Sequence, residues 1–255
     1  RDAGWMYRIG RITPDAMLNT SAHINGLTTY LPVGGSGPFA IGLPDSGLGM
    51  AAGLFVSDRV NVMGLVSDAN ANRFDFGDID EGDYFTAVEL QVMVLPLSEN
   101  AGYSKLTFWH NDGTKYGDPI NGSSGKEGWG FFIKHEQELT RDGRAVAIGR
   151  WGRSYKESAL YNQQANAHFL LYDPFRSGQY DCKDLIEADV VGTGYAWVQP
   201  SATGNQGESN AEVFYRFPIF PYTDMTLSYQ AIVNPVLNPS NDYSSAFSLR
   251  LRSTF

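Results

Sequence analysis

Charged side chains recur at alternate positions of several apolar segments, and their types suit hydrogen bonding to a polar solute. Arginine stays charged and presents a rigid fork of donors, lysine offers a point charge, and glutamate accepts hydrogen bonds. Trp109 shares a face with Lys105 and Thr107, where its ring can cover an apolar solute surface. The other candidate site residues are Arg150, Arg216, Arg250, Arg252, Glu89, Glu136 and Glu212.

These residues also have a purely structural interpretation. Charged side chains on neighbouring strands can pair with each other and do no more than hold a wall together. Glu212 and Arg216 are too far apart along one strand to pair with each other, so we expect partners across strands. Trp109 and Trp151 lie near strand ends, where aromatic rings can also form an interfacial girdle.

No residue pattern indicates catalysis. The histidines are His23, His110, His135 and His168; they fall in no recognised motif, and neither GxSxG nor HExxH occurs. We therefore expect no enzymatic activity. Cys182 is the single cysteine and has no second thiol for a disulfide or a zinc site, so its role stays open.

The charge distribution restricts the binding partners. A net charge of −9 with no basic stripe excludes nucleic acid as a partner. The acidic run Asp75–Asp83 could bind Ca²⁺, but it lacks the spacing of an EF-hand loop, so a solvated loop is the favoured interpretation. No cofactor is otherwise expected.

The elements that position these residues are expected to be β-strands, because apolar and polar residues alternate with a period of two. In the last segment, Phe247–Phe255, the polar face carries Arg250 and Arg252, and the segment ends on an aromatic residue. About twelve strands of about ten residues are expected, long enough to cross a bilayer when tilted. The others are Met6–Ile12, Leu48–Val56, Val60–Ser67, Thr86–Val94, Ser104–His110, Trp129–Glu136, Ala145–Arg153, Gln163–Tyr172, Ala188–Val198, Glu212–Phe217 and Leu227–Asn234.

The lengths of the links between these strands mostly alternate. Val56–Arg59, Thr140–Gly143 and Phe220–Asp224 are short, whereas Ala69–Gly82 and Asp112–Lys126 are long. Short turns at one end and long loops at the other are typical of transmembrane barrels, and a soluble sandwich has no reason to sort its links in this way. We therefore predict an all-β fold, a transmembrane antiparallel β-barrel. The link Asp173–Asp184 is longer than this pattern predicts.

The C-terminal stretches Glu212–Phe217, Tyr229–Pro235 and Phe247–Phe255 resemble the end of carbohydrate-selective, OprB-type porins of Gram-negative outer membranes. Tyr7–Pro14 and Gly47–Asn70 resemble further segments of that family. The resemblance implies a barrel of sixteen strands that passes small, glucose-like sugars by passive diffusion. Residues 1–255 would then form a single porin domain that lacks about four N-terminal strands; the alternative is a barrel that closes with fewer strands.

The resemblance also implies the location and the partners. These are the bacterial outer membrane with its lipid and lipopolysaccharide, small sugars, and the barrel assembly machinery, which would recognise the strand that ends at Phe255. A homotrimer stays open, because a lipid-facing surface and a protein interface look alike in sequence. The chain starts at Arg1 with no recognisable signal peptide.

The first link, Thr13–Asp45, is the longest, and long links in compact proteins are usually functional or disordered. We hypothesise that it folds inward and narrows a pore; the alternative is a cap at the outer end. A sugar presents hydroxyls at its rim and C–H groups on its faces. Paired charges with an aromatic suit it, provided that binding is weak enough for release.

Two other functions stay open. One is a general channel or a channel for another solute, although charges of mixed sign argue against the single-sign rings of ion-selective pores. The other is a soluble all-β carbohydrate-binding module. In such a module, outward positions such as Leu90, Val213 and Leu249 would pack against a second sheet.

Overall fold

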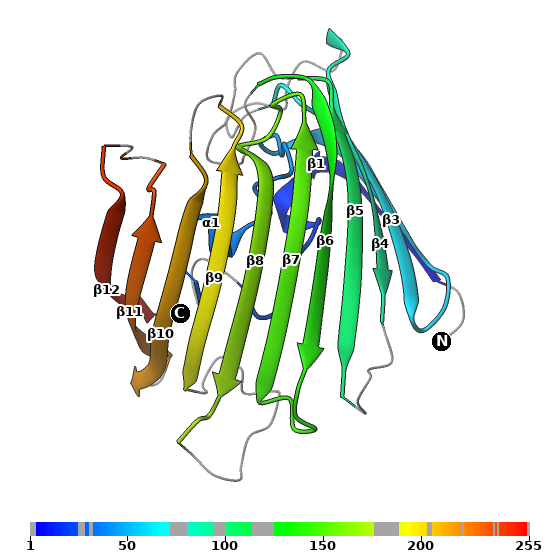
Figure 1. Cartoon of the computed structure of the whole chain (residues 1–255). Helices are drawn as coiled ribbons and strands as arrows, with labels where there is room; N and C mark the ends of the chain where they lie inside the picture. The colour runs from blue at the N-terminus through cyan, green and yellow to red at the C-terminus, as the bar shows by residue number, and fades with distance from the viewer. Residues whose placement is uncertain are drawn as a thin grey trace.

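The computed structural model describes residues 4–24, 29–30, 33–71, 81–93, 100–113, 125–175, 189–202, 206–220, 222–236, 238 and 240–253. Within them lies one 12-stranded antiparallel sheet in which sequential strands are neighbours (Figure 1). Its strands are β1 (Gly4–Ile12), β2 (Gly47–Phe55), β3 (Val60–Asp68), β4 (Tyr84–Val92), β5 (Gly102–Asn111), β6 (Gly128–Glu138), β7 (Ala145–Tyr155), β8 (Tyr161–Tyr172), β9 (Val190–Pro200), β10 (Glu208–Phe220), β11 (Thr223–Val233) and β12 (Tyr243–Ser253).

Every predicted strand is present, and the all-β class is confirmed. The links also keep the predicted alternation: 56–59, 139–144 and 221–222 are short, and 69–83 and 112–127 are long. Two links break it. Residues 173–189 form a long link among the short ones, as the sequence indicated, and residues 156–160 form a short link among the long ones.

The outward face of the sheet is apolar from strand to strand. Cross-strand partners place Leu54, Val62, Leu90, Leu106, Ile133 and Trp151 in one continuous row. The side chains at the two ends of this row, Leu54 and Trp151, are exposed, as are Val213 and Leu249. No second sheet covers this face among the described residues, so the packing that the alternative of a two-sheet soluble module requires is not found there.

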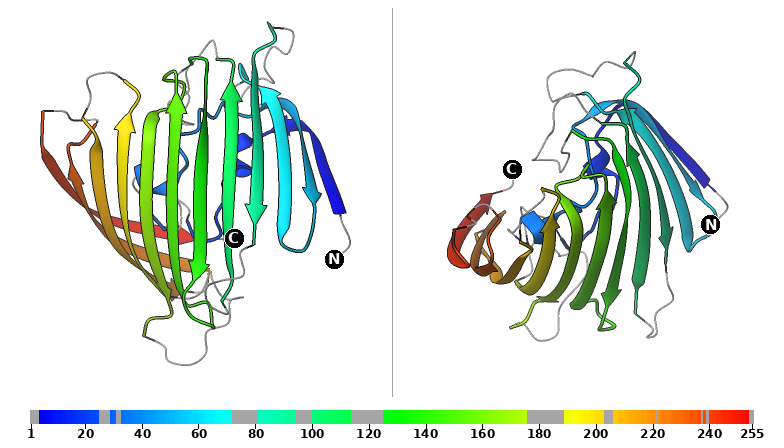
Figure 2. Two further views of the ribbon diagram at one scale, coloured as in Figure 1. Left: turned by 45° about the vertical axis from the view of Figure 1, so that its right-hand side comes forward. Right: turned by 45° about the horizontal axis from the view of Figure 1, so that its top comes forward.

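The inward face is polar and is covered by the link between β1 and β2. Figure 2 shows a curved wall with the short helices of this link, η1 (Pro14–Ala16) and α1 (Val33–Ser36), on its concave side. We call residues 13–46 the inner segment.

Two apolar clusters hold the inner segment against the wall. In the first, Leu18, Ile41 and Leu43 pack against inward residues of β2 to β6 such as Phe85 and Phe132. In the second, Ile24 and Tyr30 pack against inward residues of β7 to β10. The hypothesis that this link folds inward is therefore confirmed for its described residues.

Polar contacts fix the same segment at defined points. The Tyr30 hydroxyl donates to the carbonyl oxygens of Phe169 (3.0 Å) and Thr193 (2.8 Å), thereby bridging β8 and β9. The Gln164 carboxamide accepts from the Ala40 amide (3.1 Å) and donates to the Gly37 carbonyl (2.7 Å). The two Gln164 bonds satisfy backbone groups of the inner segment that would otherwise lie without partners against the wall.

The sheet has two edges among the described residues, because β1 pairs only with β2 and β12 only with β11. No helix in the part of the chain that the structure describes is long and apolar enough to cross a membrane. Phe255, Cys182 and residues 75–80 of the acidic run lie outside the described residues.

Candidate solute channel

All nine side chains predicted for the site point to the inward face. Cross-strand register aligns Lys105, Lys134 and Arg150 in one row across β5, β6 and β7. The others lie on the same face, but the structure does not bring them into one cluster. Arg216, Arg250, Arg252 and Glu212 lie on β10 and β12, several strands away from Glu89, Lys105 and Glu136.

Glu89 and Lys105 form the first polar junction between the wall and the inner segment. Their charged groups are 3.1 Å apart, with side chains 4% and 7% exposed. The second oxygen of Glu89 accepts hydrogen bonds from the Asn19 amide (2.6 Å) and the Thr107 hydroxyl (2.8 Å). Lys105 also donates to the Thr20 hydroxyl (3.0 Å). Glu89 and Lys105 therefore hold residues 19–20 in place and have almost no surface left for a solute.

Lys134 and Glu136 form the second junction. Their charged groups are 2.7 Å apart, and their side chains are 0% and 2% exposed. Glu136 also accepts from the Tyr103 hydroxyl at 2.5 Å, and Lys134 donates to the Thr20 carbonyl. We call these two junctions, Glu89–Lys105 and Lys134–Glu136, the clamp. The sequence reasoning did not select Lys134, although its position on the Glu136 face was the available signal.

Trp109 faces inward as expected, but the expectation that it stacks on a solute is not met in this structure. Its ring is 3% exposed and belongs to the first apolar cluster under the inner segment. A Cβ atom built on Gly42 or Gly130 would lie within about 3 Å of the indole, so both glycines leave room for it. Because the ring lies on the inward face, it does not belong to an outward aromatic girdle either. Trp151 lies exposed on the outward face, where an aromatic girdle would lie.

The last strand, β12, carries the less covered charges. The Arg252 side chain is 26% exposed and donates to Asp224 of β11 from Nε (2.8 Å) and from its terminal nitrogen. Arg250 is half-buried and donates to the Thr29 carbonyl at 3.0 Å. Arg216 and Glu212 are buried on β10. Asp224 was not selected from the sequence; as a polar residue on the inward face of β11, it was a foreseeable partner.

A cavity of about 340 Å³ lies between the inner segment and the wall. It is bordered by two parts of the inner segment, around residues 15–24 and 36–43, and by Arg150 of β7. Its polar residues include Asn19, Thr20, Ser21 and Arg150; Leu18 and Phe39 contribute apolar surface. Nothing in the periodicity of the sequence marks Asn19 or Thr20, because both lie in a link.

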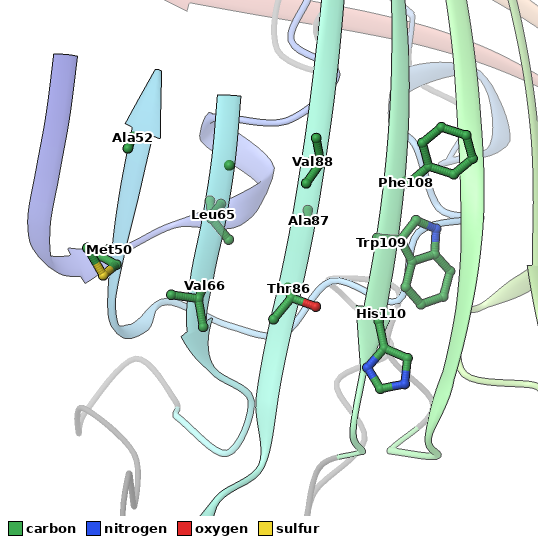
Figure 3. Close-up of a pocket in the computed structure, with 11 residues that line it drawn as sticks. Met50, Ala52, Leu65, Val66, Thr86, Ala87, Val88, Phe108, Trp109 and His110 are labelled. Atoms are coloured by element: carbon green, nitrogen blue, oxygen red, sulfur yellow. The ribbon is translucent and has the colours of Figure 1, made fainter. Parts of the chain in front are cut away.

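A larger hollow of about 540 Å³ lies on the opposite, outward face (Figure 3). It is bordered by outward residues of β2 to β5, among them Met50, Val66, Val88 and Phe108, and lies over Gly64. A side chain on Gly64 would meet no atom within 4 Å, so the missing side chain leaves the hollow. Its lining is almost wholly apolar, which makes it unsuitable for a hydroxylated solute.

The described residues contain no group of three acidic, histidine or cysteine side chains that could hold a metal ion. At the described end of the acidic run, Glu81 and Asp83 accept hydrogen bonds from the Asn70 carboxamide (3.3 and 3.0 Å). His23, in the inner segment, shares a 2.8 Å hydrogen bond with the Tyr172 hydroxyl. Burial lowers the pKa of His23, although nearby Glu136 and Glu138 partly oppose this shift.

Two solved structures have a fold similar to that of this chain. A high-pH structure of Pseudomonas putida OprB matches with a TM-score of 0.75 and 13% identity over 98% of this chain and 70% of that one. A low-pH structure of the same protein matches with a TM-score of 0.60 and 13% identity, over 98% and 62% of the two chains. No protein-family model and no curated protein sequence matches the chain. The chain therefore has an OprB-type porin fold.

Proposed function

We propose that the chain forms an outer-membrane channel through which small carbohydrates of the glucose type diffuse passively. The observation that carries this proposal is the inner segment, which is held on the polar inward face and reduces the space inside a porin-type wall. A narrowed lumen with mixed-sign charges offers weak, exchangeable hydrogen bonds to hydroxyls, which favours passage over tight binding.

The apolar outward face supports the membrane location. Large exposed side chains on neighbouring strands, such as Leu54 and Ile133, would be unfavourable in water and suit contact with lipid hydrocarbon. We further propose that residues 1–255 belong to a single barrel domain. Unpaired backbone groups at the edges of β1 and β12 would cost several kcal/mol each in lipid, so the edges need partner strands. The resemblance to OprB-type porins implies sixteen strands in the complete barrel.

The remaining partners follow from this proposal. Lipid and lipopolysaccharide would surround the outward face, and the barrel assembly machinery would recognise the C-terminal strand. A homotrimer would bury part of the outward face, and its test is the oligomeric state in detergent.

Swelling of liposomes that carry the full chain tests the function. We expect faster swelling in glucose than in a trisaccharide, and an Arg250→Ala variant with altered glucose entry. An Arg59→Ala variant, in the 56–59 turn, is the matched control. Swelling no faster than in protein-free liposomes would exclude a channel, and equal rates for both sugars would indicate a general pore.

A further inference from the structure

Two buried polar side chains border the inner cavity without satisfied partners among the described residues. Asn19 is 2% exposed, and neither its side-chain nitrogen nor its oxygen has a hydrogen-bond partner. Arg150 is 5% exposed; its Nε has no partner, and its guanidinium makes a single long contact, 3.4 Å to the Ser36 carbonyl. Buried polar groups are nearly always hydrogen-bonded, so two such groups on one cavity indicate a polar ligand.

The charges around the cavity are not balanced. Arg150 lies in a row with Lys105 and Lys134, and each lysine has its own carboxylate, Glu89 or Glu136, within 3.1 Å. Arg150 has no such ion-pair partner among the described residues. Asp15 also borders the cavity, but it is exposed, where water screens its charge. The Arg150 guanidinium is therefore buried without an ion pair of its own among the described residues, which is unfavourable unless an anion accompanies it.

We propose that this cavity binds a sugar acid, a monosaccharide that carries a carboxylate, in preference to a neutral sugar. The Arg150 guanidinium presents parallel donors that match a carboxylate in a bidentate pair. The Asn19 carboxamide offers a donor and an acceptor, which suit the hydroxyls of the ring. Phe39 and Leu18 border the same cavity and can contact its C–H faces. This proposal rests on the proposed function, because it specifies which carbohydrate the channel prefers.

The backbone at Asn19 fits this role. Asn19 has φ of +53°, a left-handed conformation that asparagine adopts more readily than most residues. Its amide is held by Glu89 at 2.6 Å, so the clamp fixes the position from which its side chain borders the cavity. The site is therefore built by the wall and the inner segment together.

Block of single-channel current by added sugar tests the preference in the full chain. We expect glucuronate to block at a concentration about tenfold or more below that of glucose, the range of a hydrogen-bonded charge. Arg150→Met should bring this ratio close to one, whereas Arg150→Lys should keep part of it. Asn19→Gly, which tolerates the left-handed backbone, should weaken block by both sugars and leave the ratio unchanged. Arg59→Met is the matched control.

The outcomes separate the two proposals. Glucose swelling with equal block by glucuronate and glucose would overturn the sugar-acid preference and leave the sugar channel in place. Block by acetate as strong as by glucuronate would overturn it too, since the cavity would then hold any small anion. Loss of swelling in every sugar would overturn the proposed function itself. If Arg150→Met fails to fold, the ratio of the blocking concentrations of glucose and glucuronate is compared in Arg150→Lys and Asn19→Gly. A ratio in Arg150→Lys equal to that of the parent would then overturn the preference.

Discussion

Strands β6 and β12 have the same sequence pattern and different surroundings. Each alternates apolar outward residues with charged inward residues, which are Lys134, Glu136 and Glu138 on β6 and Arg250 and Arg252 on β12. On β6 the side chains of Lys134 and Glu136 are at most 2% exposed and hold the inner segment. On β12 the strand is a sheet edge, and Arg252 keeps 26% of its side-chain surface.

The difference between the two strands shows that facing inward and facing a solute are separate properties. Alternation determines the face, whereas coverage by the inner segment determines what touches that face. Burial under the segment makes an isolated charge costly, so Lys105 and Lys134 each pair with a glutamate in the clamp, whereas Arg150 has no such pair among the described residues. Charges on the less covered strand can remain partly hydrated, which is what contact with a passing solute requires.

The largest expected effect comes from breaking the buried pair on β6. Lys134→Met leaves Glu136 uncompensated, and we expect a loss of about 3–5 kcal/mol in the free energy of unfolding. Arg252→Met, on β12, should lose about 1 kcal/mol or less, since that pair is partly hydrated. Guanidinium unfolding in detergent measures both. The double variant Lys134→Met with Glu136→Leu should recover much of the loss; equal losses in the two single variants would contradict the contrast between the strands.

A second, smaller effect is expected at the other junction of the clamp. Glu89→Gln weakens the bonds to Lys105 and to the Asn19 amide, which are worth about 1.5–3 kcal/mol each when charged. The inner segment should loosen, and single-channel conductance should rise. Glu127→Gln, which breaks a surface pair with Lys156, is the matched control and should leave conductance unchanged. Unchanged conductance in Glu89→Gln would mean that this junction does not restrict the lumen.

The sequence predicted the face on which each residue lies, but not what covers that face. The strands and their faces could be predicted because a period of two is local and repeats along the whole chain. The alignment of Lys105, Lys134 and Arg150 across three strands depends on the geometry of the hairpins between them. The burial of Trp109 depends on the inner segment, whose sequence has no regular alternation. Sequence reasoning therefore placed Trp109 on the correct face and gave it the wrong environment. It also missed Asn19 and Thr20, whose roles exist only once the inner segment is docked.

Glycine substitutions compare the covered inward face with the outward face. A Cβ on Gly130 would lie 2.3 Å from the Arg153 carbonyl oxygen and 2.9 Å from the Trp109 ring, whereas one on Gly64 would meet nothing within 4 Å. We expect Gly130→Ala to cost about 1–3 kcal/mol through overpacking and Gly64→Ala to change stability by at most about 0.5 kcal/mol. Thermal unfolding in detergent measures both. A Gly130→Ala protein as stable as the parent would show that both the Arg153 backbone and the Trp109 ring give way without cost.

The smallest expected effect concerns pH and the inner segment alone. Because the pKa of His23 is lowered in the folded chain, folding is favoured most above the ordinary histidine value of about 6.5. As pH falls through that value, the unfolded chain takes up a proton that the folded chain resists, and stability declines. His23→Phe removes this proton while it keeps a ring beside Tyr172. The drop in unfolding temperature between pH 7.5 and 5.5 should therefore be smaller in His23→Phe than in the parent. The carboxylates elsewhere titrate equally in both proteins and do not affect this comparison. An identical drop in unfolding temperature would mean that His23 is accessible to protons in the folded chain, so that this part of the inner segment is not packed tightly against the wall.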